Sequence, residues 1–260
     1  MFIAKVQGGL GNQLFQWALI KHLSLRYGQP GYLDLSYYNY QIGVPREFSL
    51  NKFPHIIYET WIQPEKTHKE LRTIYDSFNY KELYYKLNFN YYFEGYWQSE
   101  KYFIESEEII RKELAPVKDL HERFAKLTDG EENVISLHVR RGDYVWLSHI
   151  HPVQPLAYYQ RAVELMGDYQ RMLVFSDDLP WCRENFSFNN MTFVEGQSDM
   201  DDLWMMGLCK HNIIANSSFS WWGAWLNENH AKKVVAPKLW FGNAATMDTK
   251  DIVPAKWILL

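Results

Sequence analysis

The sequence predicts an α/β protein made of two Rossmann-like halves that meet at a cleft. The chain opens with a short apolar strand, a glycine-rich loop and then apolar residues at helical spacing. Beyond residue 133, short β-branched strands alternate with helical segments, which is typical of a parallel sheet with helices on both faces. Polar residues follow several of these strands, and open sheets of this kind bind ligands at the carboxyl ends of their strands.

The amino-terminal half begins clearly and then becomes irregular. Gly28 and Pro30 stop the first helix, and residues 51–127 mix polar and aromatic residues without a regular period. The expected elements are a strand at Phe2–Val6, a helix through Leu14–Leu23, a strand at Tyr32–Leu35, and helices near Tyr58–Asp76 and Ser99–Leu114. We expect the wall that holds an acceptor substrate to come from the irregular region Tyr37–Trp97.

The carboxy-terminal half has a sharper pattern. The polar segment 128–133 is the predicted boundary, so we expect one domain over residues 1–130 and another over residues 131–260. The expected strands are Val134–Val139, Met172–Phe175, Met191–Val194, Ile213–Ala215 and Lys233–Val235. The expected helices are Leu156–Met166, Leu179–Asn185, Ser198–Lys210 and Phe219–Glu228.

Composition excludes several classes of protein. The formal net charge of −4 argues against a general nucleic-acid surface, although it leaves room for a basic pocket that holds one anion. No stretch offers the roughly 20 apolar residues of a membrane helix, and Lys5 and Gly8 interrupt the apolar start, so we expect no signal peptide. Cys182 and Cys209 form no disulfide framework and fit a reducing cytoplasm.

The first chemical cluster is HVRRGDY at residues 138–144, where a strand turns into a loop. Arg140 and Arg141 can grip a pyrophosphate with planar, bidentate donors, and such donors stabilise a departing diphosphate. Asp143 can accept a proton or orient an arginine. The structural alternative is a surface ion pair, which usually contributes less than about 1 kcal/mol.

The second cluster is Asp177 and Asp178, at the next strand end. A carboxylate there can accept the two donors on the edge of guanine, and Asp178 can equally cap the following helix. Adjacent carboxylates can also hold a divalent cation. The pair Asp199 and Asp201 matches the aspartate–any–aspartate pattern of metal-dependent glycosyltransferases, but acidic residues are favoured at a helix start anyway. We therefore expect no metal.

Two further segments can meet a phosphorylated sugar. Ser217 and Ser218 stand between a strand and a helix, where backbone N–H groups bind phosphate readily, although plain helix capping explains them too. The glycine loop with Gly9, Asn12 and Gln13 lacks the spacing of a dinucleotide fingerprint, and its amides could meet sugar hydroxyls. The tryptophans at 221 and 222 are expected in the core. Aromatic residues are abundant, with 18 Tyr and 11 Trp, and such rings suit sugar faces as well as cores.

Four segments in collinear order resemble one known family. HVRRGDY at 138–144 matches the H-x-R-R-x-D motif shared by α-1,2-, α-1,6- and protein O-fucosyltransferases. GGLGNQLFQ at 8–16, EGYWQSEKYF at 94–103 and IIANSSFSWWGAWL at 213–226 are similar to the bacterial α-1,2-fucosyltransferases of glycosyltransferase family 11. Together the four segments span nearly the whole chain.

The resemblance implies a fold of the GT-B type and an inverting, metal-independent transfer of L-fucose from GDP-fucose, without a cofactor. Animal members of this family carry a membrane anchor that this sequence lacks, so we expect a cytoplasmic enzyme, with peripheral attachment to the inner membrane face left open. The implied acceptor is a galactose 2-hydroxyl of a β-galactoside glycan, such as a lipopolysaccharide or capsular repeat unit, and a lipid-linked acceptor stays open. A different acceptor sugar or linkage, or a sugar-binding protein without turnover, also stays open, as does a metal-dependent transferase of another sugar nucleotide.

The resemblance also assigns roles to residues. Apart from the resemblance, Asp143 is our own candidate for the general base, with His149 and His151 as rivals. The carboxy-terminal half is expected to hold GDP-fucose: the diphosphate by Arg140 and Arg141, the nucleoside by His138, guanine or ribose by Asp177 or Asp178, and phosphate by Ser217 and Ser218. Asn12 and Gln13 are expected to face the fucose.

Overall fold

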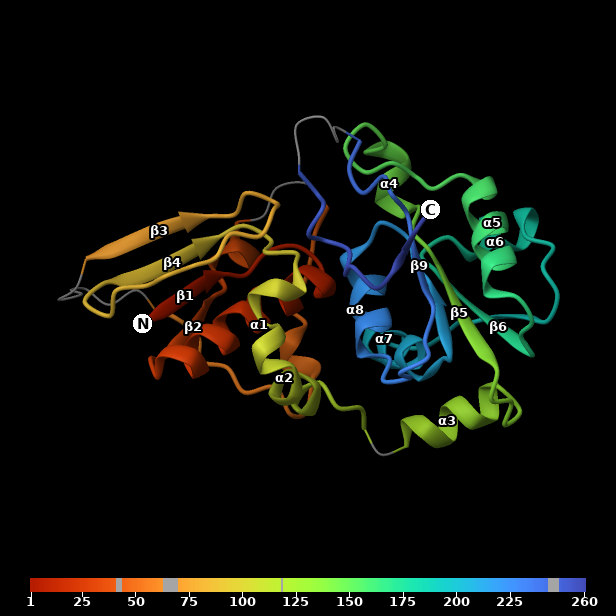
Figure 1. The fold of residues 1–260 in the computed structure, drawn as a ribbon, viewed down its shortest axis with the longest axis horizontal. Helices are drawn as coiled ribbons and strands as arrows, with labels where there is room; N and C mark the ends of the chain where they lie inside the picture. Colours follow the sequence, from red (N-terminus) through yellow and green to blue (C-terminus); the bar gives the residue numbers. More distant parts are fainter. Residues whose placement is uncertain (41–43, 63–69, 118, 243–247) are drawn as a thin grey trace. The chain divides into compact units, whose positions relative to one another are not determined.

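The computed structural model describes residues 1–40, 44–62, 70–117, 119–242 and 248–260. They divide into two compact units, unit 1 being Met1–Ala115 with Met247–Pro254 and unit 2 being Pro116–Thr246 with Ala255–Leu260. Each unit has its own parallel sheet (Figure 1). The sequence placed the boundary near residue 130, whereas the chain divides after Ala115. Helix α3 (Leu120–Leu127) therefore belongs to unit 2, where Arg123 forms an ion pair with Asp201 at 3.0 Å.

The described part of unit 1 contains a sheet of four parallel strands in the order β2-β1-β4-β3. The strands are β1 (Phe2–Lys5), β2 (Gly31–Asp34), β3 (Leu71–Tyr75) and β4 (Asn90–Glu94). Helix α1 (Leu10–Tyr27) connects β1 to β2, and helix α2 (Glu107–Glu113) follows short 3-10 turns at Ser36–Asn39, Leu50–Lys52, Glu100–Tyr102 and Ile104–Ser106.

Helix α1 forms the centre of the unit 1 core. Nearly every residue from Leu10 to Leu23 is buried, so the helix packs through most of its circumference. It ends where Gly28 takes the left-handed conformation at φ 58°, which a glycine adopts without the steric cost of a Cβ atom. The predicted strand–loop–helix–strand start is confirmed, with the helix beginning at Leu10 rather than Leu14.

The expected helices in the irregular region are wrong in two places. Within Tyr58–Asp76 the described residues contain the edge strand β3, while residues 63–69 lie outside the described part. Only the end of Ser99–Leu114 is α-helical, as α2, after two 3-10 turns. Strand β3 pairs with β4 on one side and is largely exposed, so it lacks the alternation of buried and exposed residues that marks a strand in sequence.

The described part of unit 2 contains a sheet of six parallel strands in the order β10-β9-β8-β5-β6-β7. These are β5 (Val134–Val139), β6 (Arg171–Ser176), β7 (Met191–Phe193), β8 (His211–Ile213), β9 (Val234–Ala236) and β10 (Ile258–Leu259). The helices that follow β5 are α4 (Gly142–Trp146), α5 (Leu156–Met166), α6 (Leu179–Asn185), α7 (Asp199–Leu208) and α8 (Ser218–Leu226).

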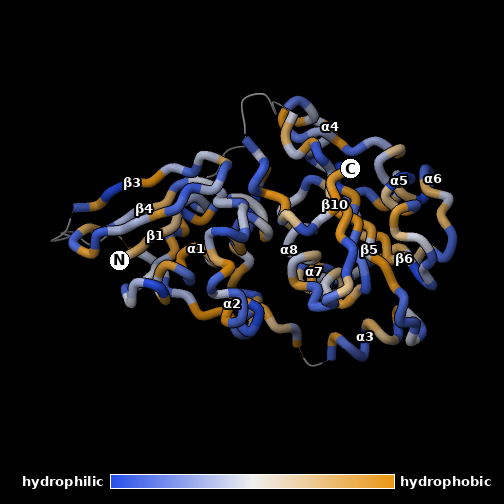
Figure 2. The backbone as a smooth tube through the Cα atoms, in the orientation of Figure 1, coloured by the Kyte–Doolittle hydropathy of each residue, from blue (hydrophilic) through white to orange (hydrophobic). Residues whose placement is uncertain are grey.

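The core of unit 2 surrounds β5, whose six residues are all buried. In Figure 2 this strand is coloured as mostly hydrophobic. Trp221 and Trp222 of α8 are fully buried, which confirms the expectation that they belong to the core. The alternating strands and helices predicted for this half are confirmed, and the structure adds α3, α4 and β10. None of the described helices is both long and apolar enough to cross a membrane.

Candidate functional site

Strand order places two of the predicted clusters beside each other in unit 2. From β5 the chain moves to β6 and β7 on one side, and then returns to place β8 on the other side of β5. Ligands of open α/β sheets bind outside the carboxyl ends of the strands at such a reversal. The segment after β5 carries Arg140 and Arg141, and the segment after β8 carries Ser217 and Ser218.

Arg141 is fixed by a carboxylate and an aromatic ring of the neighbouring strand–helix connection. Its Nε lies 3.0 Å from Oδ2 of Asp178, and its guanidinium carbon lies 4.2 Å from the centre of the Trp181 ring. Its backbone N–H donates to Oδ1 of Asp177 at 2.9 Å. Among the residues that the structure describes, this one-fifth-exposed side chain bonds through its Nε–H, and its two Nη groups remain as a fork for an anion.

Arg140 has a different environment from its neighbour. Its Nη1 lies 2.8 Å from Oδ2 of Asp177, and its Nη2 contacts Oδ1 of Asp143. The ring of Tyr144 lies 5.2 Å from its guanidinium carbon. Two carboxylates therefore neutralise Arg140, and Asp143, which the sequence offered as a base, is part of this ion-pair group.

The first residue of α4, Gly142, permits this close arrangement. A Cβ atom at this position would overlap Oδ2 of Asp177, the oxygen that contacts Arg140. Glycine therefore leaves room for the approach of this carboxylate, although it is a poor helix former.

His138, at the end of β5, is buried and neutral. Burial, reinforced by the charge of Arg140, lowers the pKa of His138 to about 3. Its ring packs against Phe219 of α8 at 5.7 Å, and its Nδ1 has no hydrogen-bond partner among the described residues. A neutral imidazole here joins the end of β5 to the start of α8.

Helix α8 directs its amino terminus into the same region. Ser217 is the N-cap, and its hydroxyl accepts the N–H of Phe219 at 3.3 Å, so it has the structural role that the sequence left open. Ser218 is the first helical residue and is partly exposed. A helix start with a partial positive charge thus stands beside the arginine segment, which is an arrangement that suits a phosphate.

The loop after β5 is tied to the end of β8 by polar contacts that sequence reasoning missed. The Tyr144 hydroxyl donates to the backbone oxygen of Asn216 at 3.1 Å. The buried Asn216 side chain accepts from Gln154 at 3.0 Å and donates to the backbone oxygens of Pro152 and Trp240. Asn216 stands within a segment already singled out, but its partners come from distant positions that no local pattern connects.

The two histidines considered as alternative bases differ in exposure. His151 stacks on Tyr144 with ring centres 4.7 Å apart, and burial lowers its pKa although Asp143 opposes the shift. His149 is exposed. His151 therefore lies beside the Arg140–Asp143 group, through Tyr144.

The glycine loop belongs to unit 1, at the reversal of strand order between β1 and β4. Gly9 is the N-cap of α1, and the side-chain oxygen of Asn12 accepts from Gln98 at 2.8 Å. Gln13 is completely buried, and its amide bonds the backbone oxygens of Gly8 and Glu47 and the N–H of Ser49. Gln13 thus has no exposed surface for a ligand and holds the loop in shape.

The carboxylates weighed as metal ligands have other partners. Asp178 is the N-cap of α6 and accepts the N–H of Trp181 at 3.2 Å. Asp201 completes a capping box with Ser198 and pairs with Arg123. Across the described ranges, no group of three or more His, Cys, Asp or Glu side chains is arranged to hold a metal ion.

Known proteins resemble this chain along its whole length. The family model described as Glycosyl transferase family 11 matches residues 1–260. The chain is 32% identical over 284 residues to an alpha-1,2-colitosyltransferase of Escherichia coli, covering 98% of this chain and 97% of that protein. It is 40% identical over 153 residues to the O-antigen biosynthesis glycosyltransferase WbnK of Escherichia coli, covering 55% of this chain and 49% of that protein.

A solved structure shares the fold at low sequence identity. The fucosyltransferase NodZ from Bradyrhizobium superposes with a TM-score of 0.51 and 14% identity, covering 85% of this chain and 91% of that chain. Two units, each built on a parallel sheet, form the GT-B type of fold that the sequence predicted.

Proposed function

Because this chain belongs to glycosyl transferase family 11, we propose that it transfers L-fucose from GDP-fucose to the 2-hydroxyl of a galactose. Membership makes it a glycosyltransferase, and the similar colitosyltransferase of Escherichia coli is named for an α-1,2 linkage. The identity of the donor, the identity of the acceptor and the course of the reaction are our proposals beyond family membership.

The observation that carries the proposal is the environment of Arg141. Arg141 follows β5 and helix α8 follows β8, the strand next to β5, so both come after the carboxyl ends of adjacent strands within one unit. A diphosphate bound there would receive bidentate hydrogen bonds from the arginine and backbone N–H groups from the helix start. Arg140, Asp143 and Asp177 form the supporting ion-pair group.

We propose an in-line displacement with inversion at C1 of fucose. The acceptor oxygen forms a bond to C1 while the bond from C1 to the diphosphate oxygen breaks, and GDP leaves with that electron pair. Positive groups at the diphosphate stabilise the departing charge more in the transition state than in the ground state, so no metal ion is required for this task. The acceptor proton goes to Asp143, with His149 and His151 as rivals.

The acceptor is a glycan that contains a β-galactoside, as in a surface polysaccharide or its lipid-linked precursor. The matched WbnK protein is named for O-antigen biosynthesis, which supports this class of acceptor. A second donor has specific support, because the relative that aligns over 98% of the chain is named a colitosyltransferase. Colitose is fucose without its 3-hydroxyl, so the same diphosphate site would serve both GDP-sugars.

The test measures GDP release from GDP-fucose and from GDP-colitose in EDTA, with and without lactose or N-acetyllactosamine. Release from GDP-fucose that depends on acceptor, with an α-1,2 linkage in the product by NMR, is the expected result. Faster turnover of GDP-colitose would instead assign the chain to the second donor. Loss of activity in EDTA that returns with a divalent cation would overturn the metal-independent mechanism.

A further inference from the structure

Unit 1 carries a cavity that the proposed donor site does not use. It has a volume of about 430 Å³ and opens at the carboxyl end of β2, with Asp34, Ser36, Tyr38, Phe48 and Trp61 among its lining residues. Ligand pockets of about 300–1,000 Å³ combine apolar and aromatic walls with a few polar groups that fix orientation. We propose that this cavity binds one pyranose ring of the acceptor glycan, with Trp61 against the ring face and Asp34 accepting ring hydroxyls. The identity of this ligand as an acceptor rests on the proposed function.

Backbone hydrogen bonds hold Trp61 at the edge of the sheet. The N–H of Leu33 donates to the oxygen of Glu59 at 2.8 Å, and the N–H of Trp61 donates to the oxygen of Leu33 at 2.8 Å. Residue 60 forms an isolated parallel bridge with Leu33. Trp61 is therefore fixed next to β2 by main-chain pairing, and its indole packs on Tyr92 at 6.0 Å between ring centres.

Asp34 is a carboxylate held by neutral donors. Its Oδ1 accepts the N–H of Ser36 at 2.9 Å, and its Oδ2 accepts the hydroxyl of Tyr92 at 2.6 Å. Burial, followed by the bond to Asp34, raises the pKa of Tyr92, so the phenol stays a donor. Within the described ranges, no lysine or arginine forms an ion pair with Asp34.

This pattern of partners leaves Asp34 able to bind a sugar. A carboxylate has about four lone-pair sites, and two of those at Asp34 are used. Among the described residues no cation forms an ion pair with Asp34, so hydroxyl donors of a ligand can occupy the remaining sites with charge-assisted hydrogen bonds. Tyr38 and Phe48, whose rings meet edge to face at 6.0 Å, supply further aromatic surface.

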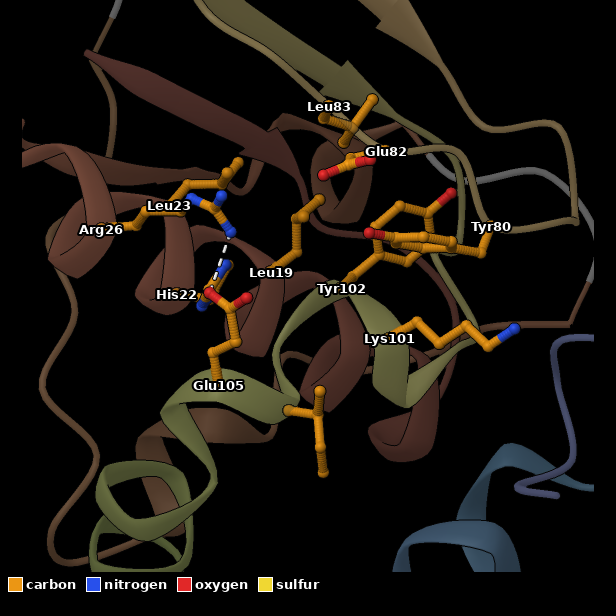
Figure 3. Close-up of a pocket in the computed structure, with 11 residues that line it drawn as sticks. Leu19, His22, Leu23, Arg26, Tyr80, Glu82, Leu83, Lys101, Tyr102 and Glu105 are labelled. Atoms are coloured by element: carbon orange, nitrogen blue, oxygen red, sulfur yellow. Dashed lines mark hydrogen bonds and ion pairs between the residues drawn. The ribbon is translucent and has the colours of Figure 1, made fainter.

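The other cavity of unit 1, of about 250 Å³, has a different character (Figure 3). Its polar lining groups pair with residues of the protein: Arg26 with Glu105 at 2.9 Å, and Lys101 with Asp251. His22 bonds Ser106 at 2.9 Å. This cavity also contains an aromatic residue, Tyr80, and so provides a matched control within the same unit.

The experiment compares Trp61→Ala, Trp61→Phe and Asp34→Asn with the control Tyr80→Ala. Binding of methyl glycosides of galactose, glucose, N-acetylglucosamine and N-acetylgalactosamine is measured by saturation-transfer NMR with GDP present. Acceptor KM, GDP affinity and unfolding temperature are measured in parallel. We expect Trp61→Ala and Asp34→Asn to weaken sugar binding by about tenfold or more, the change that about 1.4 kcal/mol of lost contact produces. Trp61→Phe is expected to restore part of the binding, while GDP affinity stays within about twofold of wild type in all four variants.

Sugar binding is measured independently of fucose transfer, so the proposed acceptor cavity and the proposed reaction can be refuted separately. No binding of any glycoside by the wild type, or equal binding by folded Trp61→Ala and wild-type protein, would overturn the acceptor cavity. An equal loss in Tyr80→Ala would overturn it as well. If glycoside binding depends on Trp61 but neither GDP-sugar is turned over, the cavity holds and the proposed reaction fails.

Discussion

Oδ2 of Asp178 lies 3.0 Å from Nε of Arg141, while Oδ1 of the same carboxylate accepts the N–H of Trp181 at the start of α6. The Asp178 side chain thus caps the start of α6 and also orients the guanidinium of Arg141. Trp181, in the first turn of that helix, lies against the other side of the contact, 4.2 Å from the guanidinium carbon of Arg141. Arg141, the residue proposed to bind the diphosphate, is therefore positioned by the same carboxylate that caps α6.

Replacing Asp178 by Asn and by Ala separates these two tasks. Asn caps a helix about as well as Asp, whereas Ala loses about 1 kcal/mol of helix or protein stability. We expect Asp178→Asn to retain wild-type stability in urea unfolding but to raise the KM for GDP-fucose, because the charged partner of Arg141 is gone. Asp178→Ala should show both defects. Identical stability of the two variants would contradict the capping role.

Arg141→Lys tests whether the two Nη groups of Arg141 bind the diphosphate. Lysine supplies a point charge without the planar pair of donors, so kcat/KM for the GDP-sugar should fall by about 10²–10³-fold. The control is Arg183→Lys, an exposed arginine on α6 that lies over the ring of Phe193. Steady-state kinetics with saturating acceptor measure the effect. Equal activity of the two variants would remove Arg141 from the diphosphate site.

Asp143→Asn tests the general base. We expect kcat to fall by about 10²–10⁴-fold with GDP affinity largely unchanged, because the acceptor hydroxyl loses its proton acceptor. Since Asp143 also contacts Arg140, weaker GDP binding in this variant would point to a supporting role instead. The variant His151→Gln, measured beside it over a pH series, tests the rival base.

Asp202 predicts a dependence of stability on pH. Burial, together with the charges of Asp199 and Asp201, raises the pKa of Asp202 to about 7. A carboxyl whose pKa is higher in the folded state contributes stability below its ordinary pKa and loses it as the pH rises through 7. Asp202→Asn should therefore raise the free energy of unfolding at about pH 8 by about 1–3 kcal/mol relative to its effect at about pH 4.

Urea unfolding at both pH values measures this difference. The control is Glu184→Gln, which replaces an exposed carboxylate on α6 and should show little pH-dependent gain. The prediction fails if Asp202→Asn changes stability equally at the two pH values.

Much of unit 2 could be predicted from sequence because its central strands β5, β8 and β9 are buried along their whole length. The run Val134–Val139 stands out for this reason, and the arginines after it are recognisable as a strand-end cluster. In unit 1, β3 is an exposed edge strand and β4 begins with the buried polar Asn90, so neither has the apolar pattern of a core strand. Their pairing is set by register between distant segments.

The roles of individual side chains were less predictable than the clusters. The sequence placed Asp177 and Asp178 at a strand end but left open guanine, metal and capping roles. Their partners, in the segment after β5 and on α6, become visible only in three dimensions. Both Asn12 and Gln13 were expected to face the fucose. Gln13 is fully buried, whereas Asn12 is half-buried, and a sequence pattern does not distinguish the two. Trp61 could not be recognised from sequence as a sugar-binding residue, because backbone pairing with Leu33 positions it and no motif marks it.

The close approach of Asp177 to Gly142 has a consequence for engineering. Programmes that seek heat-resistant variants often exchange glycines within helices for alanine, which removes flexibility from the unfolded chain. At Gly142 the added methyl group would displace Oδ2 of Asp177 and with it the arginine contact. A choice based on helix propensity alone would thus favour, at the start of α4, a substitution that shifts a carboxylate of the Arg140 ion-pair group.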